Sequence, residues 1–325
     1  MRSSVVEMEM KEGGALMLYD AVIIGGGIAG LQASIQLGRY GHRVLVLDKG
    51  TGRSELCRKY RNILGYPMGV SGPELRERGR AQAEQYDVTF VNQKAVMLKQ
   101  QDEFEVITDT QERYRGMTVL ISTGVGDRIP DIPGMMDCLG ESIYICPDCD
   151  GYEVMNRHVI IIGSGNAGAS MTSELSYFSD QLTYVNHERQ PIDAKLEKEL
   201  ASLKARVVHA PVIRVNSTAG QFHSVELAGG KQLEGEKAFI AFGGNEVRTQ
   251  LARQAGAEVA ENGHIITDPR TKMTSVEGIW AAGDVGLHSE QAVIAMGEGA
   301  QAAIWMHKRL MKLGLKTSRE LVLST

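Results

Sequence analysis

Long apolar runs are missing from this chain of 325 residues. No stretch reaches the roughly 18–20 apolar residues that a membrane-spanning helix needs. The first residues, MRSSVVEMEMKEGG, carry acidic side chains where a secretory signal peptide has an apolar segment. The sequence therefore predicts no membrane partner and no secretion signal, and we expect residues 1–17 to form a disordered N-terminal arm.

Concentrated positive charge is also missing. The chain has 35 Lys and Arg against 40 Asp and Glu, a net charge of −5 at pH 7, and no Lys/Arg-rich run. Proteins that bind nucleic acid or anionic membranes present a basic patch or stripe. We therefore expect no nucleic-acid partner.

Cysteine is scarce, with four residues at positions 57, 138, 146 and 149. They are too few and too clustered for the disulfide scaffold of a secreted domain. This distribution predicts a cytoplasmic protein. Glycine, in contrast, occurs 37 times, above its usual share of about 7%. That excess indicates tight turns and places where the backbone approaches a ligand closely.

One pattern occurs twice along the chain, in residues 19–50 and 157–189. Each segment has an apolar β-branched run, a Gly-x-Gly-x-x-Gly turn, a stretch of helical period and a second apolar run. This is the βαβ unit that opens a dinucleotide-binding fold. A single such glycine motif is weak evidence, but two that stand correctly between strand and helix are strong evidence.

The length and this duplication predict two domains. Further strand patterns follow each βαβ unit, and no Pro/Ser-rich linker separates the parts. We expect an α/β fold with two Rossmann-like domains, the second inserted into the first. The predicted boundaries are 18–128 and 245–325 for a discontinuous domain that contains the first βαβ unit, and 129–244 for the domain that contains the second.

The first glycine turn contains Gly25, Gly27 and Gly30. In such a turn the first glycine permits the sharp bend, the second lets the backbone approach a pyrophosphate, and the third lets helix and strand pack. Asp48 ends the following strand, where a carboxylate can accept a hydrogen bond from a ribose hydroxyl. The alternative is that these glycines serve packing only and that Asp48 is solvated.

The second turn repeats this arrangement with Gly163, Gly165 and Gly168. The next strand ends at Asn186-His187-Glu188, the positions that would discriminate between nucleotides, and only Arg189 is nearby. A 2′-phosphate is best bound by guanidinium groups, whereas Glu188 can accept from a 2′-hydroxyl. This favours NADH over NADPH. The alternative is a structural Rossmann unit that binds no nucleotide.

A Cys-x-x-Cys motif, Cys146-Pro147-Asp148-Cys149, stands just before the second βαβ unit. In such a pair one thiolate attacks a disulfide and the other resolves the mixed disulfide. Asp150 follows directly and can move a proton during this chemistry; the alternative is a turn or cap residue. A zinc site would need two further Cys or His ligands at suitable spacing, so we predict no metal. An inert buried pair is the remaining alternative.

The other two cysteines have different surroundings. Cys57 lies in RSELCRKYRN, among basic side chains that lower a thiol pKa, so a reactive thiol is one interpretation and a solvated loop cysteine the favoured one. Cys138, in MMDCLGE, is expected to be a small buried hydrophobe.

Together the two glycine turns and the dithiol resemble the low-molecular-weight thioredoxin reductases, from about Tyr19 to Leu313. The most specific segment is CPDCDGYEVMNRHVIIIGSGNAG, which joins the dithiol to the second glycine turn. ISTGVGDRIPDIPG resembles the strand end at which that family's chain crosses between domains, and GIWAAGDV resembles its second FAD signature. By this resemblance the further FAD-binding residues are Asn62, Thr123, Gly124, Gly283, Asp284, Gln291 and Ala292.

The resemblance implies FAD and a nicotinamide nucleotide as cofactors, a homodimer, and rotation of one domain during turnover. It implies that Cys149 faces the flavin and that Cys146 attacks the substrate, a thioredoxin-like protein or a small disulfide. We therefore expect an FAD-dependent thiol-disulfide oxidoreductase.

Three departures from the family limit this transfer. The family's arginine signature for NADPH is absent, Glu290 replaces the Arg of an Arg-Gln-Ala step, and the loop GTGRSELCRKYRNILGYP lacks Gly-Gly-Gln. Alternatives are therefore a dithiol oxidase that uses oxygen, a reductase driven by a non-nucleotide donor such as a reduced iron–sulfur protein, and a flavin-binding redox sensor. Flavin-dependent dithiol oxidases usually carry His at the place of Asp150, which favours the reductase.

Overall fold

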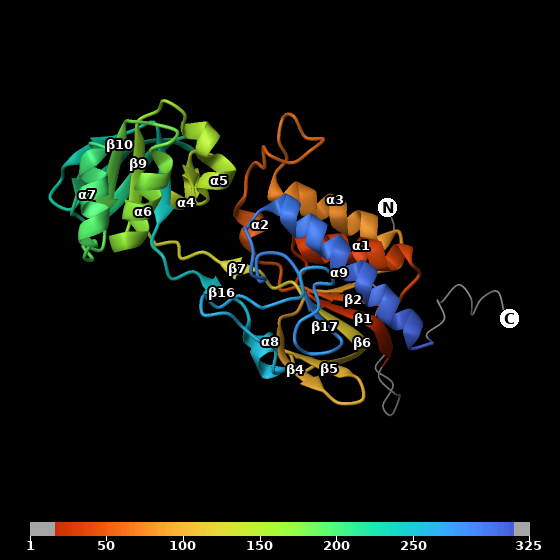
Figure 1. Cartoon of the computed structure of the whole chain (residues 1–325). Helices are drawn as coiled ribbons and strands as arrows, with labels where there is room; N and C mark the ends of the chain where they lie inside the picture. The colour runs from red at the N-terminus through yellow and green to blue at the C-terminus, as the bar shows by residue number, and fades with distance from the viewer. Residues whose placement is uncertain (1–16, 315–325) are drawn as a thin grey trace.

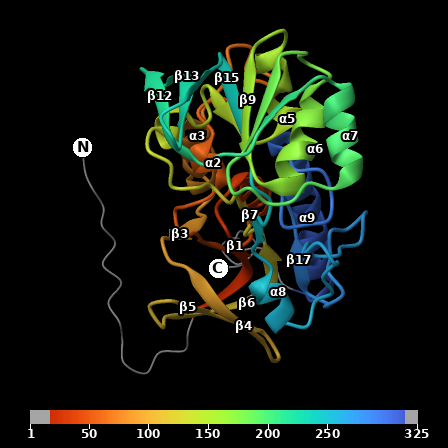
Figure 2. The ribbon, with the colours of Figure 1, turned by 90° about the vertical axis from the view of Figure 1, so that its left-hand side faces the viewer.

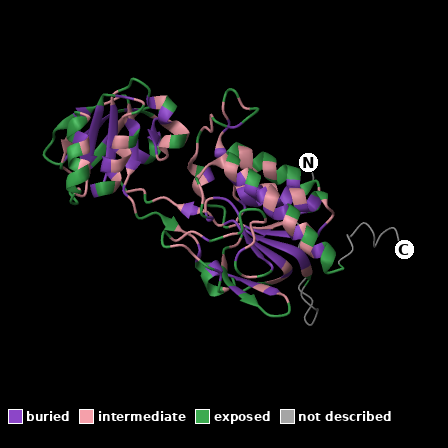
Figure 3. Cartoon of the chain, viewed as in Figure 1, coloured by how far each residue is buried: buried purple, intermediate pink, exposed green. Residues whose placement is uncertain are grey.

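The chain folds into two lobes joined by two passages of chain, shown in Figure 1 for the computed structural model. The structure describes residues 17–314, so the predicted N-terminal arm lies outside it except for Met17. Each lobe has buried strands at its centre and exposed helix faces outside (Figure 3). We refer to the lobe that contains both ends of the described chain as the first domain, and to the other as the second domain.

The first domain is built on a seven-stranded sheet. Its parallel part has the order β3-β2-β1-β6-β17, and β5 and β4 extend it from β6 by antiparallel pairing. Strands β1, β2 and β17 are buried on both faces, which explains why they read as continuous apolar runs. The strands are β1 (Leu18–Ile24), β2 (Val44–Leu47), β3 (Thr89–Val91), β4 (Ala95–Gln100), β5 (Phe104–Thr108), β6 (Arg113–Ile121) and β17 (Ile279–Ala281).

Helices α1 (Ile28–Arg39), α3 (Gly72–Glu84) and α9 (Ala292–Lys312) lie together on one side of this sheet (Figure 1). Helix α9 approaches α1 closely, since a Cβ on Gly299 would lie 2.2 Å from the carbonyl oxygen of Ala29. Its buried face consists mainly of small side chains against α1. In the described structure this helix is a core element. The short helices α2 (Arg53–Leu56) and α8 (Gln250–Gln254) complete the domain.

The second domain has a five-stranded parallel sheet in the order β11-β10-β9-β15-β8, flanked by an antiparallel sheet β12-β13-β14. Its strands are β8 (Ile143–Tyr144), β9 (Val159–Gly163), β10 (Leu182–Asn186), β11 (Arg206–Val208), β12 (Val212–Thr218), β13 (Gln221–Leu227), β14 (Gln232–Glu234) and β15 (Lys237–Ala241). Its helices are α4 (Met135–Cys138), α5 (Pro147–Asp150), the 3₁₀ helix η1 (Gly151–Val154), α6 (Gly165–Leu175) and α7 (Ala194–Ser202).

The two passages between the domains lie side by side. Strands β7 (Val125–Gly126) and β16 (Glu246–Val247) pair antiparallel there, next to the joins expected near residues 128 and 245. Seen from the side, the second domain stands above the first (Figure 2). The prediction of an α/β fold with two Rossmann-like units, the second inserted into the first, is confirmed. Within the described residues, no helix is both long and apolar enough to cross a membrane.

Candidate active site

A cavity of about 930 Å³ is lined by residues of both domains. It is bounded by the first glycine turn and α2, by the two linker strands, and by the dithiol segment. The sequence-predicted residues that line it are Gly25, Gly27, Asp48, Asn62, Thr123, Gly124, Cys146, Cys149, Asp150, Gly283, Asp284, Gln291 and Ala292. Residues from six distant parts of the sequence thus meet at one space.

The first glycine turn has the geometry of a phosphate-binding turn. Gly25 has φ +108°, and a Cβ there would lie 2.3 Å from the Ser122 carbonyl oxygen. A Cβ on Gly27 would meet no atom within 4 Å, so this backbone faces open space. Gly27 is the N-cap of α1 and has no side chain that could cap the first N–H groups of the helix. The N-terminus of α1 therefore offers N–H groups and positive potential to an anion. Gly30 instead packs, since its Cβ would lie 2.0 Å from the Gly25 carbonyl oxygen.

Asp48 lies at the cavity edge with a partner that the sequence did not indicate. Its Oδ2 accepts a hydrogen bond of 2.6 Å from Arg76 on α3, and Arg76 also pairs with Glu55. Arg76 belongs to a charged helix in which no motif distinguishes it from its neighbours. Asp48 is thereby fixed at the end of β2, where it can still accept from a ribose.

The turn at Gly283 and Asp284 is held from behind by a buried acid. Glu298 of α9, with 8% of its side chain exposed, accepts from the Gly283 N–H at 3.0 Å and pairs with Lys272 and His288, each at 2.7 Å. The hydrogen bond to Glu298 raises the pKa of His288 to about 9, so His288 is a cation at neutral pH. This triad keeps the turn in place, and Asp284 points from it toward the cavity.

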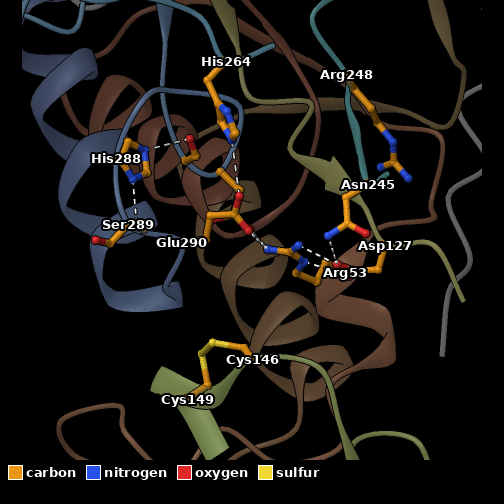
Figure 4. Close-up of polar contacts among 12 residues, drawn as sticks. Arg53, Asp127, Cys146, Cys149, Asn245, Arg248, His264, His288, Ser289 and Glu290 are labelled. Carbon is orange, nitrogen blue, oxygen red and sulfur yellow. Dashed lines mark hydrogen bonds and ion pairs between the residues drawn. A yellow bond between two sulfur atoms is a disulfide. The ribbon is translucent and has the colours of Figure 1, made fainter. Parts of the chain in front are cut away.

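Arg53 of α2 binds three carboxylates beside the cavity, and Figure 4 shows two of them, Asp127 and Glu290. It donates to both oxygens of Asp127, to Asp284 at 3.0 Å, and to Glu290, which in turn contacts His264. Two of the departures from the family therefore lie in one contact. Arg53 stands in the loop that lacks Gly-Gly-Gln, and Glu290 replaces an arginine.

The dithiol lines the cavity as a Cys146–Cys149 disulfide with a Cα–Cα distance of 5.3 Å. Cys146 is the N-cap of α5, and Pro147 occupies its first turn. The Gln291 side chain donates to the Asp148 carbonyl oxygen at 3.4 Å, which ties the dithiol segment to the first domain. Burial raises the pKa of Asp150 to about 6. In the described part of the chain, no group of three or more His, Cys, Asp or Glu could hold a metal.

Cys57 differs from its expectation. It lines the same cavity, and burial together with the charge of Asp150 raises the pKa of its thiol to about 11. The interpretation of a reactive thiol with a lowered pKa was wrong, because burial raises the pKa of Cys57 more than the nearby charge of Arg61 lowers it. The favoured interpretation, a solvated loop cysteine, was also wrong, since Cys57 is half-buried in the cavity wall. Cys138 is fully buried, as predicted.

A second, shallow hollow lies at the glycine turn of the second domain and is lined by Gly165, Asn166, Glu188 and Arg128, among others. Glu188 pairs with Arg128, and a hydrogen bond from Ser164 together with Arg128 holds the pKa of Glu188 below its usual value. The expectation that only Arg189 stands near Glu188 was therefore wrong. Arg128 comes from the linker, 60 residues away in sequence.

The other residues at this turn have structural contacts. Asn186 is buried and accepts from the Gly165 N–H at 3.1 Å, and His187 accepts from the Val212 N–H at 2.9 Å. Of the three predicted discriminating residues, only Glu188 lines the hollow. Gly163 and Gly168 are packing positions, because a Cβ there would lie 2.4 Å from the Ala241 carbonyl oxygen or 2.2 Å from the Tyr184 ring.

Comparisons with known proteins agree with this architecture. The family model for pyridine nucleotide-disulphide oxidoreductases matches residues 19–299. The chain belongs to that family. It is 30% identical over 298 residues to a thioredoxin reductase of Treponema pallidum, covering 88% of this chain and 95% of that protein. It is 26% identical over 300 residues to one of Mycolicibacterium smegmatis, with the same coverages.

Among solved structures, a Bacillus anthracis protein assigned as the thioredoxin reductase TrxB superposes with a TM-score of 0.80. The two are 26% identical over 91% of this chain and 100% of that one. The chain is thus a thioredoxin reductase-like, FAD-dependent thiol-disulfide oxidoreductase. This family implies FAD and a nicotinamide cofactor. The open backbone at Gly27 and the uncapped α1 N-terminus fit the pyrophosphate of FAD.

Proposed function

We propose that this protein passes electrons between a flavin in the large cavity and the Cys146/Cys149 pair, and that it reduces a thioredoxin-like protein or a small disulfide. The observation that carries the proposal is the shared cavity, because the glycine turn, the Asp284 turn and both cysteines line one space. A dithiol that exchanges electrons with a flavin must reach it directly. No other cysteine pair exists in the sequence at this spacing.

We assign FAD to the turn at Gly25, Gly27 and Gly30, with its pyrophosphate at the N-terminus of α1. Asp48 would accept from the adenosine ribose. The remaining contacts would come from Asn62, Thr123, Gly124, Gly283, Asp284, Gln291 and Ala292, all of which line the cavity. The flavin supplies or accepts two electrons when bound.

The dithiol chemistry needs one proton per turnover step. When two electrons break the Cys146–Cys149 bond, both sulfurs become thiolates, and one of them takes the proton that Asp150 releases. A carboxyl whose pKa lies at about 6 can release that proton near neutral pH and take it back in the reverse direction. Cys149 is assigned as the flavin-facing sulfur and Cys146 as the nucleophile toward substrate.

We further propose NADH rather than NADPH as the electron donor, bound at the turn of Gly163, Gly165 and Gly168. Support comes from Glu188, which lines this hollow and can accept from a 2′-hydroxyl. A 2′-phosphate at that place would meet a carboxylate, and the guanidinium of Arg128 is already paired with it.

Anaerobic mixing of the oxidised holoenzyme with NADH, and separately with NADPH, tests this function. We expect rapid loss of the oxidised flavin absorbance with NADH, slower loss with NADPH, and turnover when a disulfide is added. Reduction by dithiothreitol but by neither nucleotide would reject the nucleotide-driven reductase. Reoxidation by oxygen together with turnover of a dithiol substrate would favour the oxidase.

The domain division at 18–128 with 245–325, and 129–244, is part of the same proposal. It is supported by the β7–β16 pair, where the two passages meet. The family resemblance also supports a homodimer, which sedimentation analysis of the holoenzyme would test.

A further inference from the structure

One arginine of the first domain reaches into the dithiol segment of the second. Arg61 lies in the loop between α2 and α3, and its Nε is 3.3 Å from Oε1 of Glu153 in η1. Each side chain has 24% of its surface exposed, so the pair is largely shielded from water. In Figure 1 this loop rises from the first domain beside α5. The contact joins the domains in the orientation that directs the dithiol to the flavin cavity.

The same arginine has an unused donor. Its Nη1 is buried without a hydrogen-bond partner among the described residues. A buried N–H without a hydrogen-bond partner destabilises the fold, so its presence in a native protein calls for a functional or structural explanation. Arg61 lines the cavity together with Asp150 and both cysteines. Its positive charge is therefore placed beside the group that is assigned the proton transfer.

The charged and titratable groups around Asp150 come from three segments. They are Arg61 and Cys57 on the α2–α3 loop side, Glu153 in η1 and Tyr144 in β8. Arg61 is the cation among them, and Glu153 is the opposing anion. The two members of the interdomain ion pair therefore act on Asp150 with opposite sign.

We propose that Arg61 is a positioning residue of the dithiol chemistry: it ties the dithiol segment to the first domain through Glu153 and favours the ionised form of Asp150 while the domains are in contact. This inference rests on the proposed function, in which Asp150 exchanges a proton with the dithiol. Burial of Asp150 raises its pKa, Arg61 lowers it and Glu153 raises it. When the domains separate, Asp150 loses Arg61 but keeps Glu153, which belongs to its own domain.

The test uses the FAD-loaded holoenzyme. Its flavin is reduced anaerobically by dithiothreitol, and the rate of reduction is measured by rapid mixing at a series of pH values. In this direction Asp150 accepts the proton. For Arg61→Met we expect the pH midpoint assigned to Asp150 to move up, since the ionised form loses its cation. For Glu153→Gln we expect it to move down. Both variants lose the interdomain ion pair, so both should show a several-fold lower plateau rate, and Arg61→Lys should restore part of it.

Arg157→Met is the matched control, because Arg157 forms an ion pair of 2.7 Å with Glu236 at the exposed surface of the second domain. It should leave midpoint and plateau unchanged. Midpoints of Arg61→Met and Glu153→Gln that move together, or that do not move, would overturn the proposal. A purely structural role would lower both plateaus without opposite midpoint shifts.

A second readout does not depend on turnover. The infrared band of the protonated carboxyl that is lost in Asp150→Asn reports the ionisation of Asp150 in the resting protein. It should titrate at higher pH in Arg61→Met and at lower pH in Glu153→Gln. If Asp150→Asn leaves the kinetic midpoint in place, the assigned proton acceptor is wrong, while the infrared titration still decides the effect of Arg61.

Discussion

The two glycine turns of this chain have the same motif and different surroundings. At the first turn, a Cβ on the middle glycine, Gly27, would meet nothing within 4 Å. At the second, a Cβ on Gly165 would lie 2.9 Å from the Pro191 carbonyl oxygen, and the Gly165 N–H is already bonded to Asn186. The first turn opens on a large cavity and the second on a shallow hollow.

The difference shows that a Gly-x-Gly-x-x-Gly motif predicts the backbone geometry of the turn but not whether a ligand can reach it. In the second unit the loop after β10 folds back over the turn, and Asn166 exchanges two hydrogen bonds with Asp193. A dinucleotide that binds there must fit beside this loop and beside the Glu188–Arg128 pair. We therefore expect the flavin to bind tightly. We expect the nicotinamide nucleotide to bind more weakly, with a preference between NADH and NADPH that a single substitution can change.

The largest effect is expected at the dithiol, which lines the cavity of the first turn and not the hollow of the second. Cys149→Ser should reduce disulfide turnover to background while the flavin absorbance spectrum of the purified protein stays intact, because the serine hydroxyl cannot accept electrons. Cys57→Ser is the control, since it lies in the same cavity but is expected to keep turnover. Disulfide turnover that survives in Cys149→Ser would show that the dithiol assignment is wrong.

The next largest effect should distinguish the two roles of glycine in the first turn, which are ligand access at Gly27 and packing at Gly30. Gly27→Ala adds a methyl group to open space, so the apoprotein should keep its free energy of unfolding within about 0.5 kcal/mol. Its affinity for FAD should fall at least about tenfold, because the methyl group occupies the place of the pyrophosphate. Titration of the apoprotein with FAD measures this.

Gly30→Ala is the matched comparison. Its methyl group would meet backbone at 2.0 Å, and overpacking of this kind costs about 1–3 kcal/mol of folding free energy. Chemical denaturation of both apoproteins separates the cases. Equal FAD affinity for Gly27→Ala and the unaltered protein would place the pyrophosphate elsewhere.

A smaller effect is expected at the second turn. Glu188→Arg should change the ratio of kcat/KM for NADPH over NADH by about tenfold in favour of NADPH, since a guanidinium can bind a 2′-phosphate. The exposed Arg189 serves as control, and Arg189→Gln should leave the ratio unchanged. An unchanged ratio in Glu188→Arg, with both nucleotides still active, would mean that this residue does not contact the ribose.

The smallest effect concerns two ion pairs, His288–Glu298 beside the large cavity and Glu188–Arg128 at the second glycine turn. His288 has its pKa raised to about 9 by Glu298, whereas an unfolded histidine titrates near 6.5. The stabilisation from this pair is therefore fully present below about pH 6.5 and is lost as the pH rises through about 9. The difference in melting temperature between the unaltered protein and His288→Gln should shrink over that interval.

Glu188→Gln provides the contrast, because its partner Arg128 has 48% of its side chain exposed. Exposed pairs contribute about 0–1 kcal/mol, so this variant should unfold at nearly the unaltered temperature across the same range. A difference for His288→Gln that does not change with pH would show that the imidazole contributes by packing rather than by charge.

The amino-acid sequence determined the organisation of this protein. Two βαβ units, their glycine spacing and a Cys-x-x-Cys directly before the second unit are local patterns, and local patterns specify backbone geometry within a few residues. From these the α/β class, the insertion of one Rossmann-like domain in the other and the dithiol followed.

Contacts between distant residues were decided only by the tertiary structure. Arg53 pairs with Glu290 from 237 positions away, Arg128 with Glu188, and Arg61 with Glu153. The sequence around these arginines does not indicate their ion-pair partners, because each partner depends on which loops the fold brings together. The same holds for Cys57: the sequence surrounds it with basic residues, but in the fold Arg53 and Arg61 pair with carboxylates, and burial raises the pKa of the Cys57 thiol.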